Sequence, residues 1–594
     1  MSVEQNSRAE LNSPVVITGI ACRVPGADSV CAFADLLFNA RTGYGDLPAD
    51  RCDRALYFDP QKGKTGKSYS TLGGVVPERP LNRDVCPLAV EKESLFDVAH
   101  VQFAEVAATA WRNAGLIPND HRLHRTGVYV GHSGGTKSGG GLSLSTQIEE
   151  ALSFVDDIES FRQLPAELKR EILSEVTNAV RSTRPSRRSG AVPSFHAYQA
   201  AALAAQVLEL AGPRSVIDAA CASSLVALSQ AIMAIRAGRL DSAIVGGATY
   251  NNVDNLVLFS HSQACTATDS RPFDDNASGL VSSEGYVAIV ITTRDIAMLH
   301  GLPMLGVIRS VGIASDGKGR SLWAPRMEGQ VLALQRAYAD SSLDALDIDY
   351  MEAHATSTQL GDATELETLK RLAASSPAFG DKRPPNDRLL LGSVKSNIGH
   401  TLEAAGLIGL VKVLIAMQRR EIPPSLRFEN PNHNYDWSTA PVKVVAKAEP
   451  WPERSLHRRS RRAAVSAFGI GGLNAHVVIE ECPNSAVKSA FEKATDSQRT
   501  PQDFSRSAEP IAIVGRGIVV AGAKNLQEFQ SLIESTKSAI GDAPFDRWRK
   551  QAGVTAGAVP QTYQTPHSRG GYIREFEFDA ARYRIPPKQV RKFC

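Results

Sequence analysis

The chain has 594 residues, which is too long for one ordinary domain and ample for a large hydrophobic core. Hydrophobic residues make up 43% of it and charged residues 22%, and both are values of a globular protein rather than a disordered one. The net charge of +3 neither favours nor opposes nucleic-acid binding, and we expect no nucleic-acid partner.

The sequence also indicates the cellular compartment of the protein. The first 13 residues are polar and carry both signs of charge, unlike a signal peptide. The apolar run from Leu407 to Met417 is interrupted by Lys412 and is shorter than a membrane span. The eight cysteines are scattered without paired metal-ligand spacing. We therefore expect a reduced, cytoplasmic protein with no membrane span and no metal site.

Short apolar runs alternate with helical patterns along most of the chain. Expected strands lie at Pro14–Ile20, Thr126–Gly131, Asp241–Ala248 and Tyr286–Thr292, and expected helices at Leu95–Gly115 and Ala200–Ala211. Because most of these strands are continuously apolar, the pattern predicts an α/β layered fold with sheets buried on both faces.

A glycine-rich stretch from Ser133 to Gly141 precedes a helical segment from Gln147 to Arg181 that runs from acidic to basic. The stretch lacks the lysine and hydroxyl of a phosphate-binding loop. We interpret the helical segment as a solvated surface insertion, with a partner-docking element as the alternative.

The segment from Ser215 to Leu225 has the pattern of a nucleophile elbow. A β-branched run leads into small residues around Cys221, and a helix-forming segment follows at once. A helix N-terminus would favour the thiolate form of this cysteine. The alternative from this stretch alone is a small, buried core cysteine.

Two later stretches place a histidine among small and hydroxylic residues, directly after an apolar run. One is Glu352–Asp362, which holds His354, and the other is Lys395–Gly406, which holds His400. A lone histidine is more often structural, but one cysteine and two histidines in such turns favour nucleophilic acyl chemistry.

With these three motifs the sequence resembles the β-ketoacyl synthase family of the thiolase superfamily, in its polyketide and polyunsaturated fatty acid synthase branch. The resemblance runs from about Pro14 to Glu481 and keeps the motif order. Ala222, Ala355 and Ser357 depart from the usual residues, but all three are small.

The resemblance implies a thiolase-like five-layer αβαβα sandwich made of two similar halves, followed by a partial C-terminal α/β segment. We expect the cysteine half at 13–262, the histidine half at 263–482, a polar linker at 483–508 and a last segment at 509–594. That last segment begins like the first, since Pro510–Gly515 echoes Pro14–Gly19, and it resembles an incomplete second ketosynthase. The alternative is an unrelated small tail domain.

The same resemblance implies roles for individual residues in decarboxylative Claisen condensation of an acyl thioester with a malonyl-type thioester. Cys221 would carry the acyl group, His354 and His400 would stabilise the developing enolate, and Lys395 would hold the histidine turn. The backbone N–H groups of Cys221 and Phe468 would form the oxyanion hole. Substrate contacts would come from Thr356, Thr358, Asn397, Gly469 and Gly471.

The implied enzyme is an acyltransferase of the β-ketoacyl-carrier-protein synthase type, with no bound cofactor. An acyl carrier protein would deliver substrates on phosphopantetheine, and an acyltransferase would act in trans or in a longer parent chain. The family also implies a twofold homodimer, in which strands near the elbow pair across the interface.

Two alternatives to this function stay open from the sequence. A non-decarboxylating thiolase would need a second cysteine, but Cys265 and Cys482 are poorly placed for that role. A non-elongating scaffold resembling a chain-length factor typically lacks the cysteine, whereas Cys221 is present.

Two further features concern the end of the histidine half. His476, directly before an apolar run, is predicted to be structural. The basic stretch 454–462 is interpreted as a solvated face, with attraction of an acidic carrier protein as the alternative.

Overall fold

The computed structural model describes residues 13–182, 195–319, 324–375, 388–452, 460–482, 511–544, 547, 568–582 and 585. The chain divides into two compact units, the first comprising residues 1–139 and 187–495 and the second comprising residues 140–186 and 496–594. Among the described residues, no helix combines the length and the apolar character that a membrane crossing requires.

Five strands of the first unit form one half of its large sheet. Their order is β1 (Val15–Arg23), β8 (Gly285–Thr293), β6 (Ser242–Thr249), β4 (Thr126–Gly131) and β5 (Arg214–Ile217). The pairs β1–β8 and β8–β6 are antiparallel, whereas β6–β4 and β4–β5 are parallel. The inner strands are buried along their length, as their continuous apolar sequences predict.

The other half of the sheet repeats this arrangement. Its order is β9 (Gly306–Ser315), β16 (Leu473–Glu480), β15 (Arg462–Phe468), β10 (Tyr350–Glu352) and β11 (Leu389–Gly392), with β13 (Val442–Val444) added at the edge. The first two pairs are again antiparallel and the next two parallel. Within the large sheet, the two halves join where Val15–Ile17 of β1 pairs with Gly306–Ile308 of β9. The sheet topology therefore contains an internal duplication.

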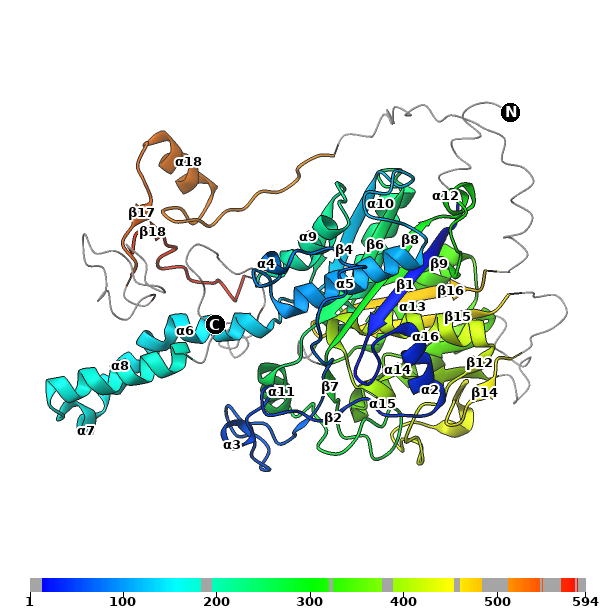
Figure 1. Cartoon of the computed structure of the whole chain (residues 1–594), viewed down its shortest axis with the longest axis horizontal. Helices are drawn as coiled ribbons and strands as arrows, with labels where there is room; N and C mark the ends of the chain where they lie inside the picture. Colours follow the sequence, from blue (N-terminus) through cyan, green and yellow to red (C-terminus); the bar gives the residue numbers. More distant parts are fainter. Residues whose placement is uncertain are drawn as a thin grey trace. The chain divides into compact units, whose positions relative to one another are not determined.

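Helices cover both halves of the sheet and fill the space between them (Figure 1). Helices α5 (Val98–Asn113) and α9 (Tyr198–Val207) pack on the first half, and α13 (Met327–Ser341) and α14 (Gln359–Ser375) lie on the second. Between the halves, α10 (Ser223–Arg236) contacts α16 (Ala405–Arg419), and both belong to one hydrophobic cluster that includes strands of both halves. These five layers confirm the predicted thiolase-like sandwich.

Shorter elements connect the layers. They are α2 (Val30–Phe38), β2 (Gly45–Asp46), α3 (Arg54–Tyr57), β3 (Leu72–Gly74), α4 (Val90–Glu93), α11 (Val253–His261), β7 (Ser282–Ser283), α12 (Arg294–Leu299), α15 (Lys395–Ile398), β12 (Glu421–Ile422) and β14 (Glu449–Pro450). Strands β2, β3 and β7 form a small separate sheet.

The strand pairing locates the division between the halves. Strand β8 belongs to the first half, so the division falls between Thr293 and Gly306, later than the boundary we predicted at residues 262 and 263. The segment Ile244–Ala248 lies inside β6, with β4 and β8 as its neighbours. The edge strand of this half is β5, which leads into the elbow.

The segment from Gln147 to Arg181 does not form one long helix. It contains the end of α6 (Lys137–Ser153), the short α7 (Glu159–Arg162) and most of α8 (Ala166–Ser182). No residue of α8 is buried, which agrees with a solvated insertion. Its partner-docking alternative stays a hypothesis.

The C-terminal segment repeats the opening of the first unit, with an offset of 496 residues as far as its helix. Val520 and Ala523 exchange backbone hydrogen bonds as Val24 and Ala27 do. Helix α18 (Leu526–Glu534) corresponds to α2, and both have an N-cap side chain that accepts a backbone hydrogen bond. Strand β17 (Ile540–Gly541) then pairs with β18 (Gly570–Gly571) in antiparallel fashion, as β2 pairs with β3.

Candidate active site

The predicted elbow forms between β5 and α10. After Ile217, the backbone of Ala220 takes a positive φ of 49°, and residues 220–222 make one tight turn before α10 begins at Ser223. The Ser223 hydroxyl fixes this turn, because it accepts a hydrogen bond from Ala219 N and donates one to Ala220 O. A positive φ is strained for alanine, and such strain is typical of functional turns.

Cys221 at this turn is buried, with 4% of its surface exposed. Burial raises the pKa of its thiol to about 12, and Glu403 adds to this, whereas Lys395 and the backbone N–H groups of Ile470 and Cys221 oppose it. Burial therefore opposes the thiolate form that we expected the helix N-terminus to favour, because a charged group is costly to remove from water.

His400 lies beside Cys221, with its Nε2 3.0 Å from Sγ. The backbone of His400 is hydrogen-bonded to the segment directly before β8. His400 N donates to Val281 O, and His400 O accepts from Ser283 N. The histidine comes after β11 and α15, from the half of the sheet opposite to that of Cys221.

His354 completes the group from the loop after β10. One ligand-type atom each of Cys221, His354 and His400 lies within 4.8 Å of the others. The two imidazole rings meet edge to face, with centroids 5.4 Å apart. The two carboxylate oxygens of Glu365 accept hydrogen bonds from the backbone N–H groups of His354 and Ala355 and so fix the loop.

Burial lowers the pKa of both imidazoles well below the usual value, and the nearby Lys395 charge acts in the same direction. Both rings are therefore neutral at physiological pH. Burial also lowers the pKa of Lys395, although Glu352 and Glu365 oppose this effect. The resting site thus contains a neutral thiol and two neutral imidazoles.

Two buried carboxyl groups beside the His354 loop were not found by sequence reasoning. Burial raises the pKa of Asp362 and of Glu365 to about 7 each, although hydrogen bonds from backbone N–H groups lower both pKa values in part. Both lie in the first two turns of α14, directly after the histidine loop. That spacing was the available signal, but only the tertiary structure shows that Glu365 binds the backbone of His354 and that Asp362 binds that of Phe273.

A buried ion pair between Lys412 and Glu352 stabilises the segments that carry His354 and Lys395. Lys412 of α16 donates to Glu352 Oε2 at 2.7 Å, and the Tyr350 hydroxyl donates to the same oxygen. Glu352 Oε1 accepts from Val394 N, directly before Lys395. Glu352 therefore links the strand before His354 to the segment that carries Lys395 and His400.

A cavity of about 320 Å³ opens onto the three side chains. Four of the other predicted site residues line it, namely Thr356, Thr358, Phe468 and Gly469. Lining residues that the sequence did not single out include Phe259, Gln263, Leu280, Ile470 and Asn474. Cys221 is the one cysteine among the lining residues; Cys265 is buried in a separate cluster.

Two predicted substrate contacts lie elsewhere. Asn397 is fully buried, and its side-chain amide donates to Arg41 O, so it stabilises the fold beneath the site. Gly471 belongs to the turn after β15 but does not line the cavity, whereas its neighbours Ile470 and Gly472 do. Our prediction that these two residues contact substrate is therefore not supported by their positions.

Gly469 brings this turn against the elbow. A Cβ atom at Gly469 would lie 2.4 Å from Ala219 O, closer than any side chain allows. The close approach places the Ile470 N–H near Cys221 Sγ.

His476 and the basic stretch lie outside the cavity lining. His476 in β16 is buried between the hydroxyls of Ser466 and Tyr338, which agrees with a structural role. Of the basic stretch, Arg461 and Arg462 are described, and they pair with Glu481 and Glu480. Residues 453–459 lie outside the described residues.

The fold and the site together define a thiolase-like protein of the cysteine–histidine–histidine kind. Residues 12–297 match the sequence model of the β-ketoacyl synthase N-terminal domain, 305–429 that of the C-terminal domain, and 431–533 that of the ketoacyl-synthetase C-terminal extension. The chain belongs to the β-ketoacyl synthase family. Residues 508–593 match the N-terminal domain again, which confirms the predicted second ketosynthase-like segment.

Known proteins support the same assignment. The chain is 33% identical to the spectinabilin polyketide synthase system protein NorC of Streptomyces orinoci, over 79% of this chain and 19% of that protein. It is 30% identical to the pikromycin polyketide synthase component PikAIII of Streptomyces venezuelae, over 91% of this chain and 33% of that protein. The chain thus spans a third or less of these curated relatives.

Among solved structures, the ketosynthase–chain length factor PfaC matches with a TM-score of 0.77 and 26% identity, over 97% of this chain and 59% of that one. The oxazolomycin ketosynthase domain OzmH KS7 of Streptomyces albus matches with a TM-score of 0.66 and 28% identity, over 82% of this chain and 76% of that one. These relatives are acyl-transferring condensing enzymes by family, and they do not favour the thiolase alternative.

Proposed function

We propose that the chain catalyses decarboxylative Claisen condensation between an acyl thioester and a malonyl-type thioester. The observation that supports this proposal most directly is the meeting of Cys221, His354 and His400 at one cavity, within 4.8 Å of one another. A nucleophile and two neutral imidazoles suit both halves of this reaction.

In the first half, the acyl group moves to Cys221. The thiol gives up its proton as Sγ attacks the thioester carbonyl, and the proton leaves with the departing carrier thiol. His400 Nε2, 3.0 Å from Sγ, is placed to take the proton and pass it on. Because both partners are neutral at rest, this transfer creates a thiolate–imidazolium pair only when the substrate is present.

In the second half, the malonyl-type thioester loses carbon dioxide, and its electron pair moves onto the thioester oxygen as an enolate. Neutral His354 and His400 can each donate one N–H to that oxygen. The enolate carbon then attacks the carbonyl carbon of the acyl group on Cys221. The bond to Sγ breaks, and Cys221 leaves as the thiolate and recovers a proton. A new carbon–carbon bond replaces the bond broken by decarboxylation.

The remaining predicted residues have supporting roles in this proposal. The backbone N–H groups of Cys221 and Phe468 bind the oxyanion formed during acyl transfer, and Phe468 lies at the cavity end of β15. Thr356, Thr358 and Gly469 line the path of the substrate. Lys395 keeps a positive charge beneath the two histidines and so disfavours their protonation.

Substrates would arrive on the phosphopantetheine arm of an acyl carrier protein, loaded by an acyltransferase. The names of the polyketide synthase relatives support this proposal. A homodimer would form through the free edge of β5, which places the interface next to the elbow. Light scattering on the purified chain tests this assembly, and a monomer at micromolar concentration would argue against it.

Mass spectrometry tests the proposed function directly. The chain is incubated with an acyl thioester, and we expect one acyl group on the Cys221 peptide and a β-ketoacyl product once malonyl carrier protein is added. Cys221→Ala should prevent both, whereas the buried Cys265→Ala should retain both. A fully active Cys221→Ala enzyme would refute the proposal.

A further inference from the structure

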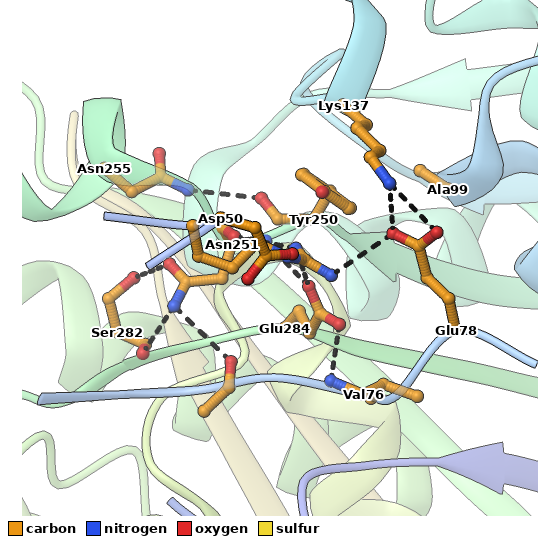
Figure 2. Close-up of polar contacts among 12 residues, drawn as sticks. Asp50, Val76, Glu78, Ala99, Lys137, Tyr250, Asn251, Asn255, Ser282 and Glu284 are labelled. Carbon is orange, nitrogen blue, oxygen red and sulfur yellow. Dashed lines mark hydrogen bonds and ion pairs between the residues drawn. The ribbon is translucent and has the colours of Figure 1, made fainter. Parts of the chain in front are cut away.

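Arg51 is buried and belongs to a polar network outside the cavity, and Figure 2 shows the contacts of this network. Its guanidinium donates to Glu284 Oε2 at 2.9 Å and to Asn251 O at 3.0 Å. The guanidinium carbon lies 4.1 Å from the centroid of the Tyr250 ring, and the Arg51 and Glu284 side chains are 5% and 1% exposed. Glu78, which also binds Lys137, lies 3.8 Å from the guanidinium at the outer side.

Both oxygens of Glu284 are engaged. Oε1 accepts from Val76 N at 2.5 Å, and Oε2 accepts from Asn251 N in addition to Arg51. The Glu284 backbone N–H donates to Gly74 O. A buried carboxylate with this many partners fixes the segments that carry them relative to one another.

Asn251 extends the network to Ser282. Its side-chain amide donates to Ser282 O at 3.0 Å, and its side-chain oxygen accepts from the Ser282 hydroxyl at 2.7 Å. Figure 2 shows these contacts between Asn251 and Ser282. The contacts of Ser282 and of Glu284 therefore fix the short segment Val281–Ser283 at its middle and directly after its end.

That segment is the one that holds His400. Val281 O accepts from His400 N at 2.7 Å, Ser283 N donates to His400 O at 2.9 Å, and Ser282 pairs with His400 as an isolated parallel bridge. Gly399 permits this close approach, because a Cβ atom there would lie 2.2 Å from Ser283 Oγ. The position of the His400 ring relative to Cys221 thus depends on where residues 281–283 lie.

We propose that Arg51, Glu284 and Asn251 are positioning residues for His400, acting through residues 281–283. They touch neither the cavity nor Cys221, so their effect is on geometry rather than on chemistry. This inference rests on the proposed function only for the role of His400 in decarboxylation.

The decisive variant is Glu284→Gln, which keeps the size of the side chain but removes the charge that pairs with Arg51. We expect carbon dioxide release from a malonyl thioester to slow by roughly 10- to 100-fold, because small displacements of a catalytic group have effects of this size. Acyl transfer to Cys221 should slow by a smaller factor, since His400 acts there only as the proton acceptor of the thiol.

Ser282→Ala is a second, milder variant, for use in case Glu284→Gln fails to fold. It removes one hydrogen bond to Asn251 and leaves the ion pair intact. We expect the same preferential loss of decarboxylation, by about threefold or more, with a melting temperature near that of the wild type.

Asp120→Asn is the matched control. Asp120 is also buried and paired with an arginine, Arg122, but it lies in the loop before β4 and contacts neither residues 281–283 nor the cavity. We expect it to lower stability and to leave the ratio of the two half-reactions unchanged.

Alkylation of Cys221 by iodoacetamide gives a readout that does not depend on condensation. Displacing His400 should slow alkylation in Glu284→Gln and Ser282→Ala but not in Asp120→Asn, because the thiol loses its proton acceptor. If the wild type releases no carbon dioxide, the proposed function fails and alkylation alone decides the inference. Equal losses in both half-reactions with unchanged alkylation would overturn the positioning role.

Discussion

Ala220 and Leu402 occupy matching positions in the two halves of the fold. Each takes a positive φ, 49° for Ala220 and 43° for Leu402. Each lies at the start of a three-residue turn, 220–222 or 402–404, that leads directly into one of the two central helices. The duplicated sheet topology thus extends to the strained residue at each turn.

The residues that follow these two positions have diverged. Ala220 is followed by Cys221, whereas Leu402 is followed by Glu403, which accepts hydrogen bonds from the hydroxyls of Thr249 and Ser133. One turn therefore presents the thiol of Cys221 to the cavity, and the other joins the two halves through the hydrogen bonds of Glu403. Glu403 also contributes to the raised pKa of the Cys221 thiol.

Substitution of Ala220 tests whether the strained turn places the nucleophile. Ala220→Gly should fold with a free energy of unfolding within about 1 kcal/mol of the wild type, because relief of strain and added freedom of the unfolded chain oppose each other. Ala220→Val should lose more than about 1 kcal/mol, since a β-branched residue tolerates positive φ poorly. Chemical denaturation and acyl transfer to Cys221 measure both effects. Equal behaviour of the two variants would contradict the role of the turn.

His400→Ala separates the two half-reactions. We expect Cys221 still to accept an acyl group, more slowly because its proton acceptor is lost, while carbon dioxide release from a malonyl thioester falls by roughly 100- to 1,000-fold, as for loss of one oxyanion donor. His476→Ala provides the control, because that histidine is equally buried but does not line the cavity. Loss of acylation with intact decarboxylation would reverse the roles proposed here.

The buried Asp362 carboxyl group should make stability depend on pH. Its pKa is about 7 in the folded protein, above the value of about 4 in the unfolded chain. Between these values the unfolded state has released the proton and the folded state retains it, so stability falls as pH rises through this window. Asp362→Asn removes this term, and its stability relative to the wild type should improve with pH, on the order of 1 kcal/mol per unit.

Asp120→Asn should behave in the opposite way. Arg122 holds the pKa of Asp120 below its usual value, so this carboxylate contributes stability above about pH 4 that is lost as pH falls. The variant should therefore differ most from the wild type at neutral pH. Urea denaturation of both variants between pH 4 and 8 measures the two slopes, and parallel curves would contradict the assignment of Asp362.

The C-terminal segment should be dispensable for acyl transfer. Ile511 and Ile513 correspond by the 496-residue offset to Val15 and Ile17, yet they are 97% and 85% exposed, whereas Val15 and Ile17 are fully buried. The segment thus contains the sequence of a central strand without its partner strands. Deleting residues 486–594 should leave the acylation rate unchanged and shift the melting temperature by less than about 2 °C. A large loss of either would show that the segment belongs to the catalytic unit.

Much of the site could be predicted from the sequence because its reactive groups lie in local motifs. Cys221, His354 and His400 each follow an apolar run and lie among small residues, and these patterns require no knowledge of distant contacts. The alternation of apolar strands and helices likewise predicted the layered fold, since burial on both faces dictates continuous apolar strands.

Other features depend on contacts between residues far apart in the chain. Glu365 fixes the His354 loop, Lys412 pairs with Glu352, and Arg51 pairs with Glu284 at a separation of 233 residues. No local pattern marks such partners, because a charged residue in the sequence is usually solvated. Only the tertiary packing buries these groups and makes their pairing necessary.

The protonation state of Cys221 likewise depends on a local feature of the sequence and on a tertiary one. From the sequence, a cysteine before a helix predicted a thiolate, since the helix dipole is a local property. In the folded protein Cys221 lies between the two halves, and loss of water raises the pKa of its thiol to about 12. The sequence alone predicted which atoms would react, and the tertiary structure decides the environment that sets their charge, because desolvation depends on every layer that covers them.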